Sequence, residues 1–77
     1  MELFQLRYFL AVAQFEHVTK AAESLHVAQP AVSKTIRNLE SELGAELFER
    51  TGKGLRRTEQ GDILLRYARA ILNAELD

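Results

Sequence analysis

The side chains with the clearest chemistry in this chain follow its single proline, Pro30. Hydroxyl and basic groups recur there at spacings that share one side of a helix: Ser33, Lys34, Arg37 and Ser41, with Ala31 near the helix start. The opposite side repeats apolar residues and predicts a buried stripe: Val32, Ile36, Leu39 and Leu43. Pro30 suits the first helical position. Such a helix could insert into a DNA major groove, but it could also be a solvated surface helix. The neighbouring segments are needed to distinguish these two interpretations.

A second short helix is predicted immediately before it. Thr19 is the expected N-cap, and Ala21, Ala22 and Leu25 supply a buried side whose small residues allow two helices to cross closely. His26 follows as the turn residue, since histidine tolerates positive φ. We favour this interpretation over a catalytic or metal-binding histidine, because no carboxylate–histidine pattern accompanies it.

A glycine-rich hairpin is predicted after the proline-led helix, which should end at Gly44. The segments 45–50 and 55–58 can form short strands around the turn Thr51-Gly52-Lys53-Gly54. This Gly-Lys-Gly lacks the spacing and the terminal hydroxyl residue of a phosphate-binding P-loop. The hairpin is therefore interpreted as a wing that brings Lys53 and its flanking arginines to phosphates or a minor groove; a plain surface hairpin is the alternative.

Two longer helices are predicted at the ends of the chain, one over about 3–15 and one over 59–77 that Thr58 caps. The last helix has a single polar stripe and is apolar on most of its remaining surface. A chain of 77 residues cannot cover two apolar helix faces by itself. We therefore expect a second copy to cover part of this helix, and assign to dimerisation Leu64, Leu65, Ala68, Ile71 and Leu72.

Length and composition exclude several classes of protein. The chain is 47% hydrophobic and fits one small domain rather than a disordered segment. It contains no apolar run near the roughly 20 residues that span a bilayer, and no basic-led secretory signal. The absence of cysteine excludes disulfides and thiolate metal sites. Neither a nucleophile–base set nor a metal-ligand cluster is evident, so we expect no enzyme and no cofactor.

The net charge of −1 is unfavourable for nucleic-acid binding, but its distribution is more informative. Six cations lie between residues 31 and 57, with the acidic residues of that segment clustered between them. A basic helix tip and a basic hairpin can therefore share one side of the molecule. We expect modest non-specific affinity for one copy, and hence a need for dimers.

A series of short motifs runs along the whole chain: Leu6-Arg7-Tyr8-Phe9, Ala11-Val12-Ala13, Ala21-Ala22, Leu25-His26-Val27, Gln29-Pro30-Ala31-Val32-Ser33, Ile36, Leu39-Glu40, Leu43-Gly44, Leu47-Phe48, Arg50, Thr58 and Gly61. In order and spacing, this series resembles the N-terminal DNA-binding domain of LysR-type bacterial transcriptional regulators, with its linker helix. The resemblance implies a mainly α, winged helix-turn-helix domain over 1–58, with its helix-turn-helix at about 18–37 and its wing at about 45–58. A linker and dimerisation helix over 59–77 would follow. The family's C-terminal effector-binding domain, which would take a small-molecule effector, is absent from this chain.

The resemblance also implies site residues and partners. The groove-facing positions fall on Gln29, Pro30, Ala31, Ser33, Lys34 and Arg37, and those of the wing on Arg50 and Lys53. Ala28 stands where the family often has a capping serine, and Lys34 where arginine is common, so Lys34 can read a base or hold a phosphate. The implied partners are double-stranded DNA and a second copy through the linker helix, with tetramers possible at full length.

A bacterial cytoplasmic location at the nucleoid follows from this expectation. The alternative function is a helical dimerisation and protein-interaction module whose basic face only solubilises it. Titration with random duplex DNA at two salt concentrations would separate the two.

Overall fold

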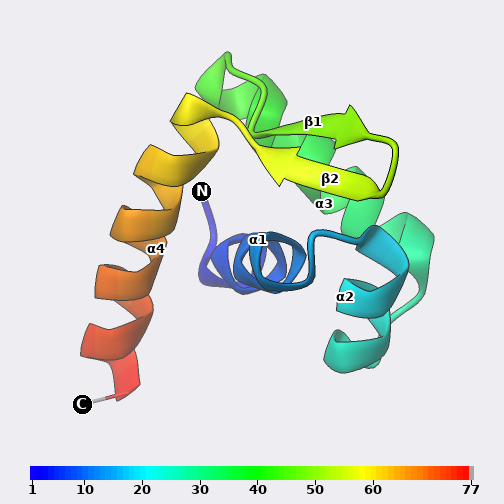
Figure 1. The fold of residues 1–77 in the computed structure, drawn as a ribbon. Helices are drawn as coiled ribbons and strands as arrows, with labels where there is room; N and C mark the ends of the chain where they lie inside the picture. Colours follow the sequence, from blue (N-terminus) through cyan, green and yellow to red (C-terminus); the bar gives the residue numbers. More distant parts are fainter. Residues whose placement is uncertain (77) are drawn as a thin grey trace.

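The computed structural model describes residues 1–76, with side chains described up to Asn73; Asp77, the predicted last residue of the final helix, lies outside the described residues. The elements are α1 (Leu3–Phe15), α2 (Val18–Leu25), α3 (Gln29–Leu43), β1 (Phe48–Thr51), β2 (Gly54–Arg57) and α4 (Glu59–Leu76). Figure 1 shows α1 in the middle, α4 on one side of it and α2 on the other, with the β1–β2 hairpin beside α3. The predicted mainly helical, winged helix-turn-helix fold is confirmed.

The core forms around α1, which packs against α2, α3 and α4. Phe9 and Val12 of α1 are fully buried with Val32 and Leu39 of α3. The small buried pair Ala21 and Ala22 lets α2 approach this core closely, as the sequence predicts. The predicted apolar stripe of α3 is correct except at its end, because Leu43 is exposed.

The turns that precede and follow α2 both use a left-handed residue. Glu16 ends α1 with φ 52°, and His26 ends α2 with φ 60° while its backbone N–H donates to the carbonyls of the preceding turn. The prediction for His26 is confirmed. The predicted cap of α2 is wrong: the helix begins one residue before Thr19, and His17 caps it by accepting the Lys20 backbone N–H at Nδ1, 3.3 Å away.

The start of α3 also differs slightly from prediction. The helix begins at Gln29, so Pro30 lies second rather than first within it. Ala28 is the N-cap and makes no side-chain cap bond, as expected for a residue without a hydroxyl. Gly44 ends α3 with φ 67°, which confirms the predicted stop.

The wing is a short antiparallel hairpin, and its register pairs Phe48 with Arg57 and Thr51 with Gly54. It begins three residues later than predicted, because residues 45–47 connect it to α3. Phe48 packs on Phe9 of α1 with ring centroids 5.3 Å apart. The Leu55 backbone N–H donates to the Glu16 carbonyl oxygen at 2.9 Å. The hairpin is thereby attached to the turn between α1 and α2.

The start of α4 is held by side chains from both sides. Thr58 caps it as predicted: its Oγ1 accepts the Gly61 backbone N–H at 3.1 Å and donates to the Glu46 carbonyl oxygen at 2.6 Å. Arg57 donates from Nε to Asp62 Oδ1 at 2.7 Å and from Nη1 to the Ala13 carbonyl oxygen at 3.2 Å. These bonds set the direction in which α4 leaves the wing.

The residues predicted for dimerisation differ in how far the single chain buries them. Four of the five, namely Leu64, Leu65, Ala68 and Leu72, are buried in the core of the single chain, each at most 9% exposed. They offer too little surface to form the main part of an interface. Only Ile71, at 44% exposed, remains from that set. The sequence showed two apolar faces on this helix but did not show which one the chain itself covers.

Candidate nucleic-acid interface

The first turns of α3 present the side chains that the sequence assigned to a groove. Five of these residues are exposed at the start of the helix, while Ser33 is half-buried: Gln29, Pro30, Ala31, Lys34 and Arg37. Thr35 is buried on the opposite side, where its hydroxyl donates to the Ala31 carbonyl oxygen at 2.9 Å. The helix thus buries one side as far as Leu39 and leaves the other open from its N-terminus to Arg37.

The wing lies along this open side and forms a groove with it. Ser33, Arg37 and Glu40 of α3 line one wall of the groove, and Phe48, Arg50 and Leu55 of the wing line the other. The strand register explains the wing's contribution, because Arg50 pairs with Leu55 and alternate residues of a strand share a face. The structure therefore brings Arg50 beside Ser33 and Arg37, three positions that the sequence assigned separately.

Lys53 occupies a different place. It lies in the turn between β1 and β2 and lines a hollow with Lys20 and Arg56, next to the turn between α1 and α2. Lys20 was not among the predicted site residues. Its position at the start of α2 was a signal, because the first helix of a helix-turn-helix crosses the DNA backbone.

Charge pairing divides the six cations between residues 31 and 57 into two groups. Within the described part of the chain, four have no ion-pair partner: Lys34, Arg37, Arg50 and Lys53. Arg56 pairs with Glu49 across the strands, with Nε 2.8 Å from Oε1. Arg57 pairs with Asp62 and is part of the attachment of α4. The four predicted contact cations are therefore the ones that remain available for a ligand.

Three of the four acidic residues in this segment accept hydrogen bonds: Glu40, Glu42 and Glu49. Glu40 accepts the Leu47 backbone N–H at Oε2, 2.8 Å away, and thereby holds the loop between α3 and β1. Glu42 accepts a bond from the Met1 ammonium group at 3.0 Å. Glu42 and Glu49 are not among the residues that line the groove, whereas Glu40 lies at its rim. Its backbone bond explains why a carboxylate is present there.

A hydrogen bond joins two of the predicted contact residues. The Gln29 Nε2 group donates to Ser33 Oγ at 2.6 Å, one helical turn away. Sequence reasoning placed both residues on the open face but did not predict that they contact each other.

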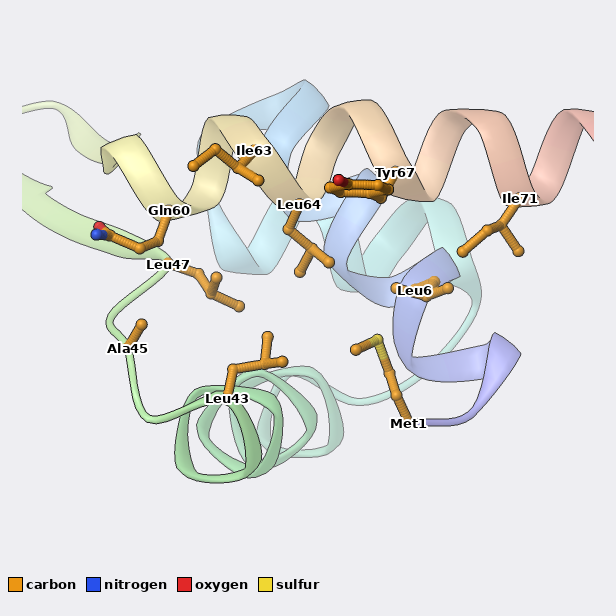
Figure 2. A pocket seen from close by; sticks show the side chains of 10 residues that line it. All are labelled: Met1, Leu6, Leu43, Ala45, Leu47, Gln60, Ile63, Leu64, Tyr67 and Ile71. Carbon is orange, nitrogen blue, oxygen red and sulfur yellow. The ribbon is translucent and has the colours of Figure 1, made fainter.

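A second surface is apolar and lies where α4 passes the ends of α1 and α3. It is an open groove of about 420 Å³, shown in Figure 2. Its exposed apolar side chains come from α3, α4 and the N-terminus: Met1, Leu43, Ile63, Tyr67 and Ile71. Tyr67 is 64% exposed, an unusual position for so large a ring. We call this surface the apolar groove.

The described residues contain no group of three potential metal-binding side chains. Among the same residues, no helix is both long and apolar enough to cross a membrane.

Comparison with known proteins gives a consistent result. The family profile described as bacterial regulatory helix-turn-helix protein, lysR family, matches residues 3–62. The RuBisCO operon transcriptional regulator of Allochromatium vinosum is 52% identical over 71 residues, which are 92% of this chain and 24% of the relative. The HTH-type transcriptional regulator PcaQ of Agrobacterium fabrum is 51% identical over 69 residues, 90% of this chain and 22% of the relative. The chain thus spans about a quarter of the length of these relatives.

Solved structures agree. A crystal structure of a complex between the CbnR DNA-binding domain and DNA matches with a TM-score of 0.93 and 41% identity, covering 97% of this chain and 86% of that one. The complex of the BenM DNA-binding domain with its catB site 1 DNA matches with a TM-score of 0.92 and 44% identity, covering 96% and 82%.

Proposed function

Because the chain belongs to the LysR family of bacterial regulatory helix-turn-helix proteins, we propose that it binds double-stranded DNA as the sequence-reading part of a transcriptional regulator. The observation that carries the proposal is the position of the four unpaired cations. Lys34, Arg37, Arg50 and Lys53 lie on the open face of α3 and on the adjacent wing. The DNA complexes of the similar CbnR and BenM domains support the choice of ligand.

In this proposal, α3 enters the major groove with its first turns at the base edges, and the wing follows the backbone or the adjacent minor groove. Gln29, Ser33 and Lys34 are the candidates for base contacts. Arg50, Lys53 and the newly identified Lys20 are the candidates for phosphate contacts. Pro30 and Ala31 keep the helix tip small, so that it can approach the floor of the groove.

We further propose that two copies associate through α4, with the apolar groove as the shared surface. Ile63, Tyr67 and Ile71 recur every four residues and form a continuous exposed stripe on α4. Leu43 and Met1 extend this stripe onto the rest of the domain. An exposed apolar surface of this kind marks an interaction site, and a twofold dimer would cover it in both copies. Two DNA-reading units would also compensate for the low net charge of each.

For the whole protein, we propose that a small-molecule effector binds outside the 77 residues described by this sequence, as the family resemblance implies. We also propose that tetramers form at full length. We propose no enzymatic role, because the relatives are named as transcriptional regulators. A place of action at the bacterial nucleoid, in the cytoplasm, follows from binding DNA.

A salt titration tests the proposal. Fluorescence anisotropy with a random duplex, measured at several salt concentrations, should show affinity falling steeply as salt rises. A dimer that neutralises roughly 6–10 phosphates would give a log–log slope of about −0.9 per contact. Binding that does not respond to salt, or no binding at all, would favour the alternative, a dimerisation and protein-interaction module that uses the apolar groove.

A further inference from the structure

Glu49 and Arg56 form an ion pair on the outer face of the wing. The strand register pairs them directly, and neighbouring residues of a strand point to opposite faces, so both lie on the side away from the groove beside α3. Arg56 donates from Nε and from Nη2 to Glu49 Oε1, and Nε is 2.8 Å from that oxygen. The side chain of Arg56 is 68% exposed and that of Glu49 is 47% exposed. An ion pair this exposed adds little to the stability of a fold, so stability does not explain it.

Arg56 also lines the hollow beside the turn between α1 and α2, together with Lys20 and Lys53. We call this hollow the basic hollow. Within the described part of the chain, Lys20 and Lys53 form no ion pair, whereas Arg56 does. Among the lining residues Glu16 is acidic, but the carboxylate that pairs with Arg56 belongs to Glu49, outside the lining. The basic hollow therefore gathers three cations, and one of them is neutralised from outside.

The geometry of the ion pair restricts what Arg56 can offer to a phosphate. A guanidinium group binds phosphate most strongly through two parallel N–H groups. Glu49 already accepts from the edge that carries Nε and Nη2. A phosphate at this edge would have to displace the carboxylate, and a phosphate at another edge would lie close to a second negative charge. Both arrangements weaken the contact.

We propose that Glu49 is an affinity-limiting residue, which keeps Arg56 from contacting a DNA phosphate at the basic hollow. This proposal rests on the proposed DNA-binding function and specifies how the strength of that binding is set. Because the phosphate backbone is the same in every sequence, the limit acts equally on all duplexes. It lowers the affinity of one copy for random DNA, and thereby increases the dependence of binding on a second copy.

The test compares Glu49→Gln with the unaltered chain by fluorescence anisotropy on a random duplex at several salt concentrations. Glutamine keeps the length of the side chain and an acceptor oxygen but removes the charge. One added phosphate contact per copy should raise affinity by roughly 3- to 10-fold near 0.1 M salt and make the log–log slope more negative by about 0.9. Unchanged affinity would overturn the proposal. Weaker binding would also overturn it, because Glu49 would then position Arg56 for the DNA.

The matched control is Glu59→Gln, which changes the net charge by the same amount. Glu59 is exposed at the start of α4 and lines neither the groove beside α3 nor the basic hollow. It should leave the affinity and the salt slope nearly unchanged. A gain equal to that of Glu49→Gln would show that only the net charge matters, which would overturn the proposal.

A double-mutant cycle tests whether Glu49 acts through Arg56. In the Arg56→Gln background, Glu49→Gln should no longer steepen the salt slope, and its gain in affinity should be much smaller. An equal gain in both backgrounds would mean that Glu49 repels DNA without Arg56, and the proposal would be refuted. Thermal unfolding of each variant verifies that the fold is intact.

The outcomes separate this proposal from the one on which it rests. Salt-dependent binding of random duplex by the unaltered chain supports the proposed function whatever Glu49 does. If that binding is present and Glu49→Gln does not strengthen it, the limiting role alone is refuted. If neither the unaltered chain nor Glu49→Gln binds random duplex, the proposed function itself fails.

Discussion

Lys34 and Lys53 carry the same charge but occupy different parts of the exposed surface. Lys34 lies within the first turns of α3, and Lys53 lies in the turn of the wing. We expect Lys34→Ala to reduce the discrimination between an operator and a random duplex by about 1–3 kcal/mol. Lys53→Ala should weaken binding to both duplexes similarly and lower the salt slope by about one per subunit. Paired titrations with the two duplexes measure both effects.

The control for these two changes is Arg66→Ala, which removes an exposed cation from α4, away from α3 and the wing. It should leave both duplex affinities nearly unchanged. A uniform loss with Lys34→Ala would assign that lysine to a phosphate instead of a base. If Lys53→Ala affected only operator binding, the two roles would be reversed.

Glycine is required at one end of the wing turn but not in its middle. At Gly54 an added Cβ would overlap the Glu16 carbonyl oxygen, and φ is 149°. At Gly52 nothing lies within 4 Å of such a Cβ. Gly54→Ala should therefore lower the free energy of unfolding by about 1–3 kcal/mol, whereas Gly52→Ala should change it little. Denaturant unfolding of the two variants measures the difference, and equal effects would contradict the close approach of wing and turn.

At the scale of the elements, the sequence predicted two threonines as helix caps, but only one of them caps a helix. Thr58 Oγ1 accepts the Gly61 N–H, while Thr19 lies inside α2 and is exposed. Thr58→Ala should destabilise the fold by about 1 kcal/mol or more, because the Glu46 carbonyl oxygen loses its donor as well. Thr19→Ala should have a small effect. Chemical denaturation compares them, and a larger loss at position 19 would contradict the observed helix start.

At the scale of the whole molecule, the proposed dimer depends on the exposed face of α4. Ile71→Glu places a charge in the apolar groove and should shift the chain towards monomer, weakening operator binding at the same time. Asn73→Glu, on an exposed position outside the groove, is the matched control and should leave association unchanged. Sedimentation at tens of micromolar, roughly the range of moderate dimer affinities, measures both.

We expect a different outcome for a substitution at Leu72 in the same helix. It is only 9% exposed, so Leu72→Glu buries an unpaired charge and should unfold the chain rather than dissociate a dimer. Circular dichroism distinguishes unfolding from dissociation. If Ile71→Glu left a dimer of unchanged affinity, the apolar groove would not be the interface.

Local signals in the sequence were sufficient to predict the helices and the residues on the open face of α3. Apolar spacing predicted every helix to within a few residues. The conformational and hydrogen-bonding properties of single residues are local, so the sequence was also sufficient to identify the helix ends at His26 and Gly44 and the cap at Thr58. The exposed positions of α3 followed from the same periodicity, since a helix that buries Val32, Ile36 and Leu39 must expose the opposite residues.

Tertiary structure decided which surfaces meet. Packing of the wing against the helices places Arg50 in the groove beside Ser33 and Lys20 near Lys53. Side-chain rotamers determine the bond from Gln29 to Ser33. The same is true of α4, where periodicity showed two apolar faces and only packing against α1 revealed that Leu64, Leu65, Ala68 and Leu72 belong to the core. A sequence pattern states that a face is apolar; what covers that face depends on distant parts of the chain.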